Sequence, residues 1–257
     1  MSPLRNKCKI EVSLSLKNHL SISCCLLLGF GGFLLGTGCS KSKPNPSPDN
    51  SPILKVRDDL KSGDYEACLK DSKDITSQVP PGPFAEEAYY LHAYAMAFGR
   101  SDFQAAKLSL KQLLDLYPSG RYALDAQRLL ADCQYWLGHY QTAGKEYKKL
   151  STVFAGKGLE SYALFQTGNS LLLDDKVGDA LAAYRELTDK YPTDPLADSA
   201  QLMIANSYIK LQNYKQAKAE LQKLVSFTRD KDIQDAAQKA LRQIEEEEPF
   251  RKGVGVP

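Results

Sequence analysis

In the second half of the chain, apolar residues recur among polar ones with a spacing typical of paired helices. From residue 195 to 211, and again from 213 to 225, apolar residues recur every three or four positions. That spacing collects them on one face of an α-helix. A short polar stretch separates the two segments, so the sequence predicts two amphipathic helices joined by a tight turn.

The same pattern recurs along the chain with a period of 37 residues. Related turn motifs begin at Gly63, Ser101, Gly138, Asp175 and Gln212, with one step of 38 residues and three of 37. Two further columns keep the step of 37 residues: Ala126, Ala163, Ala200 and Ala237, and Leu113, Leu150, Leu187 and Leu224. Several independent columns in one register indicate an array of repeats.

Each repeat is predicted to be a helical hairpin with a filled corner and a close helix–helix contact. An aromatic residue or a valine follows each turn and is expected to fill the corner: Tyr65, Phe103, Tyr140, Val177 and Tyr214. A small residue stands further along each of the last four second helices, namely Ala106, Ala143, Ala180 and Ala217. Such a residue lets two helices approach closely, so helix packing explains the column.

The columns divide the chain into about five units, near residues 52–80, 83–118, 120–155, 158–192 and 194–229. Residues 231–248 keep the register for one more first helix, which predicts a capping helix with a polar outer face. Residues 249–257 are predicted to be a disordered tail. The expected fold class is therefore all-α, with about five helix pairs and a C-terminal capping helix.

These units resemble the tetratricopeptide repeat. The resemblance rests on a small residue near the middle of the first helix (Ala131, Gly168, Ala205), the turn, the alanine of the second helix and the closing prolines Pro118 and Pro192. It covers residues 51 to about 229 and implies a right-handed α-solenoid. The period of 37 departs from the usual length of about 34 residues, and Tyr94 stands at the small position of the second unit.

The first 38 residues have the order of an export signal. Basic residues precede an apolar run from Leu20 to Leu35, and small residues follow. The segment LLGTGC resembles the lipobox of bacterial lipoproteins, which implies lipidation of Cys39, although Gly36 stands where that family prefers leucine. An ordinary cleaved signal or an uncleaved anchor are the alternatives. Residues 39–51, rich in proline, are predicted to be an extended tether.

Composition then narrows the class of function. Without residues 1–38 the chain carries 29 basic and 30 acidic residues, so no excess of positive charge indicates nucleic acid as a partner. Cys68 and Cys133 fall in columns of small residues two units apart. Because repeats contact only their neighbours, we expect both to be buried and not to form a disulfide.

No group of residues has the spacing of a catalytic or metal site. His92 and His139 lack a cysteine or carboxylate at ligand spacing, and no phosphate-binding or nucleophile motif is present. We therefore expect a protein that is not an enzyme, with no catalytic residue, no metal and no cofactor.

By the resemblance, a concave surface formed by the first helices would bind protein segments. Its expected residues are Leu91, Ala95 and Phe98; Arg128, Asp132 and Tyr135; Phe165, Asn169 and Leu172; and Leu202, Asn206 and Ile209, while Tyr162 and Trp136 fit either the groove or the core. Asn169 and Asn206 occupy equivalent places, but the lysine of a carboxylate clamp is missing. The alternative is that these side chains only pack between helices.

The whole architecture, with anchor, tether, repeats and cap, resembles the BamD family of outer-membrane lipoproteins, and its repeats are also similar to those of the CpoB/YbgF family. The first resemblance implies a lipid-anchored protein of the outer membrane that faces the periplasm. Its partners would be β-barrel assembly subunits and unfolded outer-membrane proteins, with the membrane contacted through the lipid. The alternative is a lipid-anchored scaffold of another envelope complex, in Tol–Pal and cell-wall coordination or in secretion.

Overall fold

The computed structural model describes residues 51–78, 81–153 and 159–251, with the side chains of the last helix described up to Glu246. These residues belong to one compact unit, Asp49–Pro257. The predicted signal, Cys39 and nearly all of the predicted tether lie outside the described residues, as do residues 252–257.

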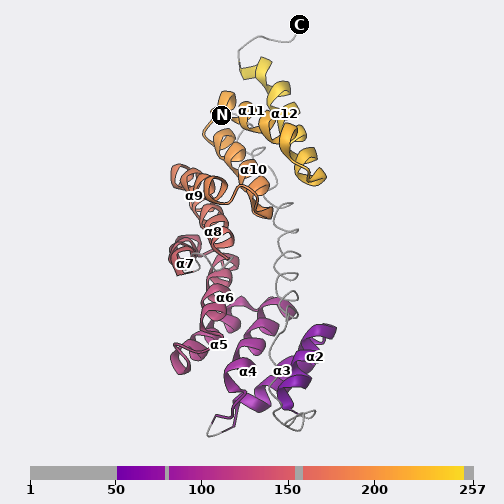
Figure 1. Cartoon of the computed structure of the whole chain (residues 1–257), viewed down its shortest axis with the longest axis vertical. Helices are drawn as coiled ribbons and strands as arrows, with labels where there is room; N and C mark the ends of the chain where they lie inside the picture. Colours follow the sequence, from indigo (N-terminus) through magenta and orange to yellow (C-terminus); the bar gives the residue numbers. More distant parts are fainter. Residues whose placement is uncertain (1–50, 79–80, 154–158, 252–257) are drawn as a thin grey trace, which may run out of the picture. The chain divides into compact units, whose positions relative to one another are not determined.

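The described residues form helices and no strand, which confirms the all-α prediction. Each α-helix packs against the next one in the chain (Figure 1). The pairs are α2 (Pro52–Ser62) and α3 (Tyr65–Thr76); α4 (Ala85–Tyr94), extended by the π-helix η2 (Ala95–Gly99), and α5 (Phe103–Leu116); α6 (Ala123–Trp136) and α7 (Tyr140–Val153); α8 (Glu160–Leu173) and α9 (Val177–Lys190); and α10 (Pro195–Lys210) and α11 (Tyr214–Phe227). The final helix is α12 (Lys231–Arg251).

The turn inside every hairpin has a residue with left-handed backbone at the same position. Among the residues that the structure describes, φ is positive at Gly63 (78°), Ser101 (54°), Gly138 (79°), Asp175 (63°) and Gln212 (58°). They are the residues at which the five turn motifs of the sequence begin. In the first, second and fifth units the next residue, Asp64, Asp102 or Asn213, accepts a hydrogen bond from a backbone N–H of the following helix, which caps that helix.

Replacing Gly138 by alanine is expected to lower the free energy of unfolding by about 1 kcal/mol, because left-handed backbone costs a non-glycine residue about 1–2 kcal/mol. A Cβ at this position would contact nothing within 4 Å, so the backbone alone is tested. The measurement is urea denaturation. The matched control is Gly178→Ala, where space is also open but φ is not left-handed; helix propensity predicts a gain of up to about 1 kcal/mol there. Equal changes in the free energy of unfolding at both sites would contradict the left-handed backbone assigned to Gly138.

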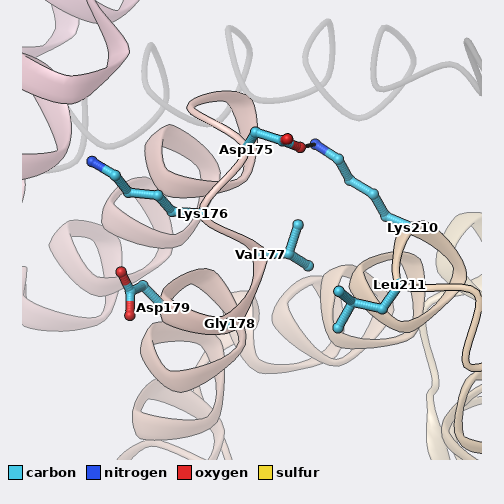
Figure 2. A pocket seen from close by; sticks show the side chains of 7 residues that line it. All are labelled: Asp175, Lys176, Val177, Gly178, Asp179, Lys210 and Leu211. Carbon is cyan, nitrogen blue, oxygen red and sulfur yellow. Dashed lines mark ion pairs between the residues drawn. The ribbon is translucent and has the colours of Figure 1, made fainter.

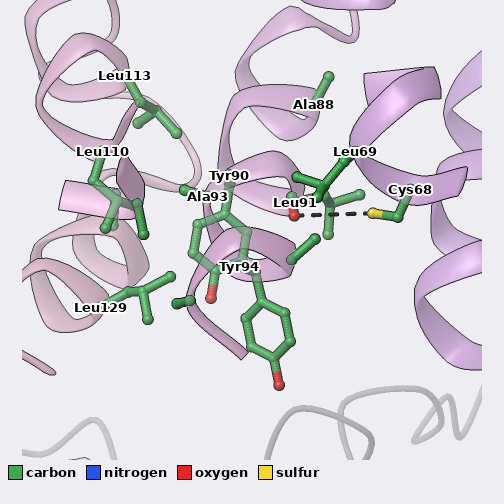
Figure 3. Packing of buried hydrophobic residues seen from close by; sticks show 14 of the residues in the cluster. Cys68, Leu69, Ala88, Tyr90, Leu91, Ala93, Tyr94, Leu110, Leu113 and Leu129 are labelled. Atoms are coloured by element: carbon green, nitrogen blue, oxygen red, sulfur yellow. Dashed lines mark hydrogen bonds between the residues drawn. The ribbon is translucent and has the colours of Figure 1, made fainter. Parts of the chain in front are cut away.

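The repeat columns form the core. Ala106, Ala143, Ala180 and Ala217 are all fully buried, and so are the members of the two other columns, to within a few per cent. Figure 3 shows this packing in the first units, with Leu110, Leu113 and Leu129 on one side of Tyr90 and Leu69 and Cys68 on the other. The four alanines are thus buried at equivalent places, as expected of small residues between closely packed helices.

Both described cysteines are buried and free, as expected. The Cys68 thiol lies 4.0 Å from the carbonyl oxygen of Leu91, which accepts its weak hydrogen bond (Figure 3). Burial raises the pKa of Cys68 to about 11 and that of Cys133 to about 12. Neither thiol is therefore a nucleophile near neutral pH.

The second unit contains one additional residue, which the π-helix accommodates. In the other four units the N–H before the second helix bonds to a carbonyl five residues earlier, as from His139 to Gln134. In the second unit Asp102 instead bonds to Met96, six residues earlier. A single π turn inserts one residue into a helix without ending it.

This insertion corrects the alignment of the second unit. Before the π turn the step to the third unit is 38 residues, since the first-turn bonds of Ala88 to Phe84 and of Ala126 to Tyr122 are equivalent. The small mid-helix residue of the second unit is therefore Ala93, which is fully buried. The expectation that Tyr94 holds this place was one residue out of register.

The array ends on α12, which packs against α11 and α10. Ala237 and Ile244 are buried in this contact, and Ile233, Ala240 and Leu241 lie partly buried beside them. The backbone of α12 continues to Arg251, three residues beyond the predicted end at residue 248. The helix continues through Pro249. A proline removes one backbone hydrogen bond but does not always end a helix.

Candidate protein-binding surface

The predicted groove residues lie on the first helices and fall into two classes. The buried ones are Leu91, Ala95, Arg128, Asp132, Tyr135, Phe165, Asn169 and Leu172. The half-buried ones are Phe98, Tyr162, Leu202, Asn206 and Ile209. Trp136 is 36% exposed and stacks on Phe103 with 6.0 Å between ring centroids. Only the half-buried residues and Trp136 present appreciable side-chain surface.

The third unit holds a buried polar network. The Asp132 carboxylate accepts hydrogen bonds at one oxygen from the hydroxyls of Tyr147 (2.6 Å) and Tyr162 (2.8 Å). Its other oxygen accepts from Nη1 of Arg128, one turn earlier, at 3.3 Å. The Arg128 guanidinium also lies over the Tyr162 ring, 5.8 Å from its centroid. Helices α6, α7 and α8 are therefore tied together through one carboxylate.

Burial and charge act in opposite directions in this network. Burial raises the pKa of the Asp132 carboxyl, while Arg128 and the two tyrosine hydroxyls oppose that rise. Burial also works against the charge of Arg128, but Asp132 keeps the Arg128 pKa above its ordinary value. The pKa of Tyr147 is raised far above its ordinary value, first by burial and then by Asp132. The network is thus a structural ion pair, and neither tyrosine is an acid near neutral pH.

The two asparagines of the groove prediction have different surroundings. The amide oxygen of Asn169 accepts a hydrogen bond of 2.7 Å from the hydroxyl of Tyr184, and its nitrogen donates to Gln166. Asn206 is half-buried, and its described contact is a long one, 3.9 Å from its nitrogen to the Met203 sulfur. Leu221 stands where the fourth unit has Tyr184. The amide oxygen of Asn169 is therefore already bonded, whereas the described residues provide no donor to the amide oxygen of Asn206, which is open to a partner.

An open cleft of 510 Å³ lies between the hairpin turns of the fourth and fifth units. Figure 2 shows Val177 facing Leu211 across it, with Lys210 reaching over to Asp175. The Lys210 ammonium lies 2.8 Å from the Asp175 carboxylate and donates to the carbonyl of Leu172 at 2.9 Å. The Lys210–Asp175 ion pair thus joins the two turns across the cleft, which identifies the cleft as a joint between units.

The described part of the chain contains no cluster of three or more histidine, cysteine or acidic side chains placed to hold a metal ion. Across the same residues no helix is both long and apolar enough to cross a bilayer.

Comparison with known proteins supports the repeat register. A model of the tetratricopeptide repeat matches residues 87–120, 162–194 and 199–227, which fall in the second, fourth and fifth hairpins. The chain thus contains tetratricopeptide repeats. The families that it matches are typically non-catalytic, and tetratricopeptide arrays are scaffolds for protein interactions.

Among curated proteins, the chain is distantly similar to the outer membrane protein assembly factor BamD of Xylella fastidiosa. The two are 21% identical over an alignment that covers 77% of this chain and 88% of that protein. A tetratricopeptide repeat protein from Parabacteroides merdae superposes with a TM-score of 0.62 at 15% identity, covering 76% of this chain and 72% of that one. MamA from Desulfovibrio magneticus RS-1 gives 0.59 at 16% identity, covering 70% and 95%. Both structures share the fold.

Sequence reasoning missed the tyrosines of the second helices. Tyr147 and Tyr184 stand 37 residues apart, and each bonds to a polar residue 15 positions earlier, Asp132 or Asn169. The signal in the sequence lay in two repeat positions taken together. Where the second helix has this tyrosine, the first helix has a polar residue 15 positions earlier that accepts its hydrogen bond. The shifted register also makes Tyr90 and Tyr94, and not Leu91 and Ala95, the equivalents of Arg128 and Asp132.

Proposed function

We propose that this tetratricopeptide-repeat protein is a lipid-anchored, non-catalytic scaffold of the outer membrane that takes part in the assembly of β-barrel outer-membrane proteins, as its relative BamD is named for doing. The observation that carries the proposal is the similarity to BamD, because it extends over 88% of that protein and is not confined to one repeat. The lipobox-like segment before Cys39 and the tether after it agree with such an anchor.

Protein partners would bind on the side of the first helices. The half-buried residues Phe98, Leu202, Asn206 and Ile209 supply apolar surface with one amide, which suits an extended peptide segment that needs both apolar contact and a backbone hydrogen bond. The buried members of the same set, including Arg128 and Phe165, would hold the helices in place beneath that surface.

Co-purification from detergent tests the assembly role. The native protein should recover the core β-barrel component of the insertion machinery, and the substitution pair Leu202→Ala and Asn206→Ala should weaken this recovery without unfolding the array. Recovery of a different envelope complex, such as one of cell-wall coordination or secretion, with no β-barrel component, would contradict the proposal and favour a scaffold of that complex.

The anchor has a separate test. A Cys39→Ala precursor should fail to incorporate labelled lipid and should keep its signal, whereas Cys68→Ala should mature normally. Normal maturation of the Cys39→Ala precursor would refute the lipid anchor while leaving the scaffold role to be judged by co-purification.

A further inference from the structure

One position of the second helix carries a cation in four consecutive units. The residues are Lys73 on α3, Lys111 on α5, Lys148 on α7 and Arg185 on α9, separated by steps of 38, 37 and 37 residues. All four are exposed. Because equivalent positions of stacked repeats face the same way, these residues form one line along the outer side of the second helices. We refer to this line as the basic row.

The lysines of the basic row are not paired with acidic side chains. Several exposed lysines elsewhere form ion pairs, for example Lys55 with Asp71 at 2.8 Å and Lys190 with Glu186 at 2.7 Å. The three lysines of the row form no ion pair with the residues that the structure describes, and Arg185 donates a hydrogen bond to the hydroxyl of Tyr208. The row is therefore available to an external anion.

Apolar side chains are exposed on the two middle helices of the row. Leu108 and Leu116 on α5 are 59% and 49% exposed, and Val153 on α7 is 41% exposed. Leu108 precedes Lys111 by three residues, so the two share a face of the helix. Cations beside exposed apolar residues on helices that lie along a surface are typical of contact with the interface of a bilayer.

We infer that the basic row is a docking surface for a lipid bilayer that carries anionic headgroups. This inference rests on the proposed function in one respect, since an anchor at Cys39 would hold the array within reach of a bilayer. A single lipid chain gives only marginal membrane binding, and a basic patch is a usual second contribution. The row would turn the second helices toward lipid and leave the first helices facing protein partners.

The four cations of the basic row have different neighbours, so the inference can be tested by comparing them within one protein. Four residues after the cation stand Ser77, directly after α3, and Thr152 on α7, but Asp115 on α5 and Asp189 on α9. An aspartate one turn away offsets the attraction of its lysine or arginine for an anionic surface. Lys73 and Lys148 should therefore contribute more to membrane binding than Lys111 and Arg185.

The experiment measures flotation of the compact unit Asp49–Pro257 with vesicles. This unit lacks Cys39, so the result does not depend on the lipid. It should bind vesicles that contain phosphatidylglycerol, not vesicles of phosphatidylcholine alone, and lose binding as salt shortens the Debye length below about 10 Å. K73Q/K148Q should lower the partition coefficient about tenfold and K111Q/R185Q about threefold.

The matched control is K215Q/K223Q, which removes two exposed charges from α11, outside the row, and should change binding less than twofold. Absence of binding to anionic vesicles would overturn the inference, as would equal losses in all three pairs. Capture of an acidic protein by the row without vesicle binding would also overturn it. None of these results would bear on co-purification with assembly subunits, which judges the proposed function.

Discussion

Replacing Asp132 by alanine is expected to lower the free energy of unfolding by about 3–5 kcal/mol. The substitution leaves the Arg128 guanidinium buried without its counter-charge, and the hydroxyls of Tyr147 and Tyr162 without their acceptor. Removing one partner of a buried pair costs more than the pair contributes, because an isolated buried charge has lost its water. Urea denaturation followed by circular dichroism measures the loss.

Two tyrosine substitutions provide matched controls for this effect. Tyr147→Phe removes a hydrogen bond to a charged acceptor, for which about 1.5–3 kcal/mol is expected. Tyr184→Phe removes the equivalent hydroxyl of the next unit, whose acceptor is the neutral amide of Asn169, and should cost about 1 kcal/mol. A loss at Asp132 below about 1 kcal/mol, or a larger loss at Tyr184 than at Tyr147, would contradict the view that a buried, charged Asp132 carboxylate ties these helices together.

Replacing Gly168 by alanine is expected to lower stability by about 1–3 kcal/mol, although alanine favours helix more than glycine by about 1 kcal/mol. The added Cβ would lie 2.4 Å from Cε1 of Tyr184, whose ring is fully buried and whose hydroxyl is held by Asn169. The third unit holds Ala131 and Tyr147 at the equivalent places, so a small displacement of the ring accommodates a methyl, which limits the cost.

A second substitution distinguishes a clash from a general intolerance of change in α8. The second and fifth units have leucine in place of tyrosine, Leu110 and Leu221, opposite alanine. Gly168→Ala combined with Tyr184→Leu should therefore recover part of the stability that Gly168→Ala loses, as measured by thermal or urea denaturation. If the double variant loses more free energy of unfolding than the two single variants lose together, the packing described here is contradicted.

The hydropathy pattern was sufficient to predict the helix pairs, because an amphipathic helix that must bury one face repeats its apolar positions. It also predicted the small residues of the second helices and the place of each turn, since each is required once per hairpin. It failed at the π turn of the second unit, where one added residue shifts half a helix while both halves remain amphipathic.

The site was less predictable than the fold. Whether the amide oxygen of Asn169 or of Asn206 is already bonded depends on residues 184 and 221, each 15 positions later and on another helix. Arg128 and Asp132 read as polar groove residues, yet they are buried and bound to each other. Charge alone does not tell a buried ion pair from an exposed one, because the difference lies in the side chains that cover it.

The central claim is that protein partners bind on the first-helix side of the array. Site-specific photo-crosslinking in intact cells tests it directly, with the reactive residue placed at Phe98, Leu202 or Asn206, and at Gln112 or Gln222 on the second helices as controls. The account predicts that envelope proteins are captured from the first three positions and not from the last two. Capture from Gln112 and Gln222, with none from Phe98, Leu202 and Asn206, would contradict it.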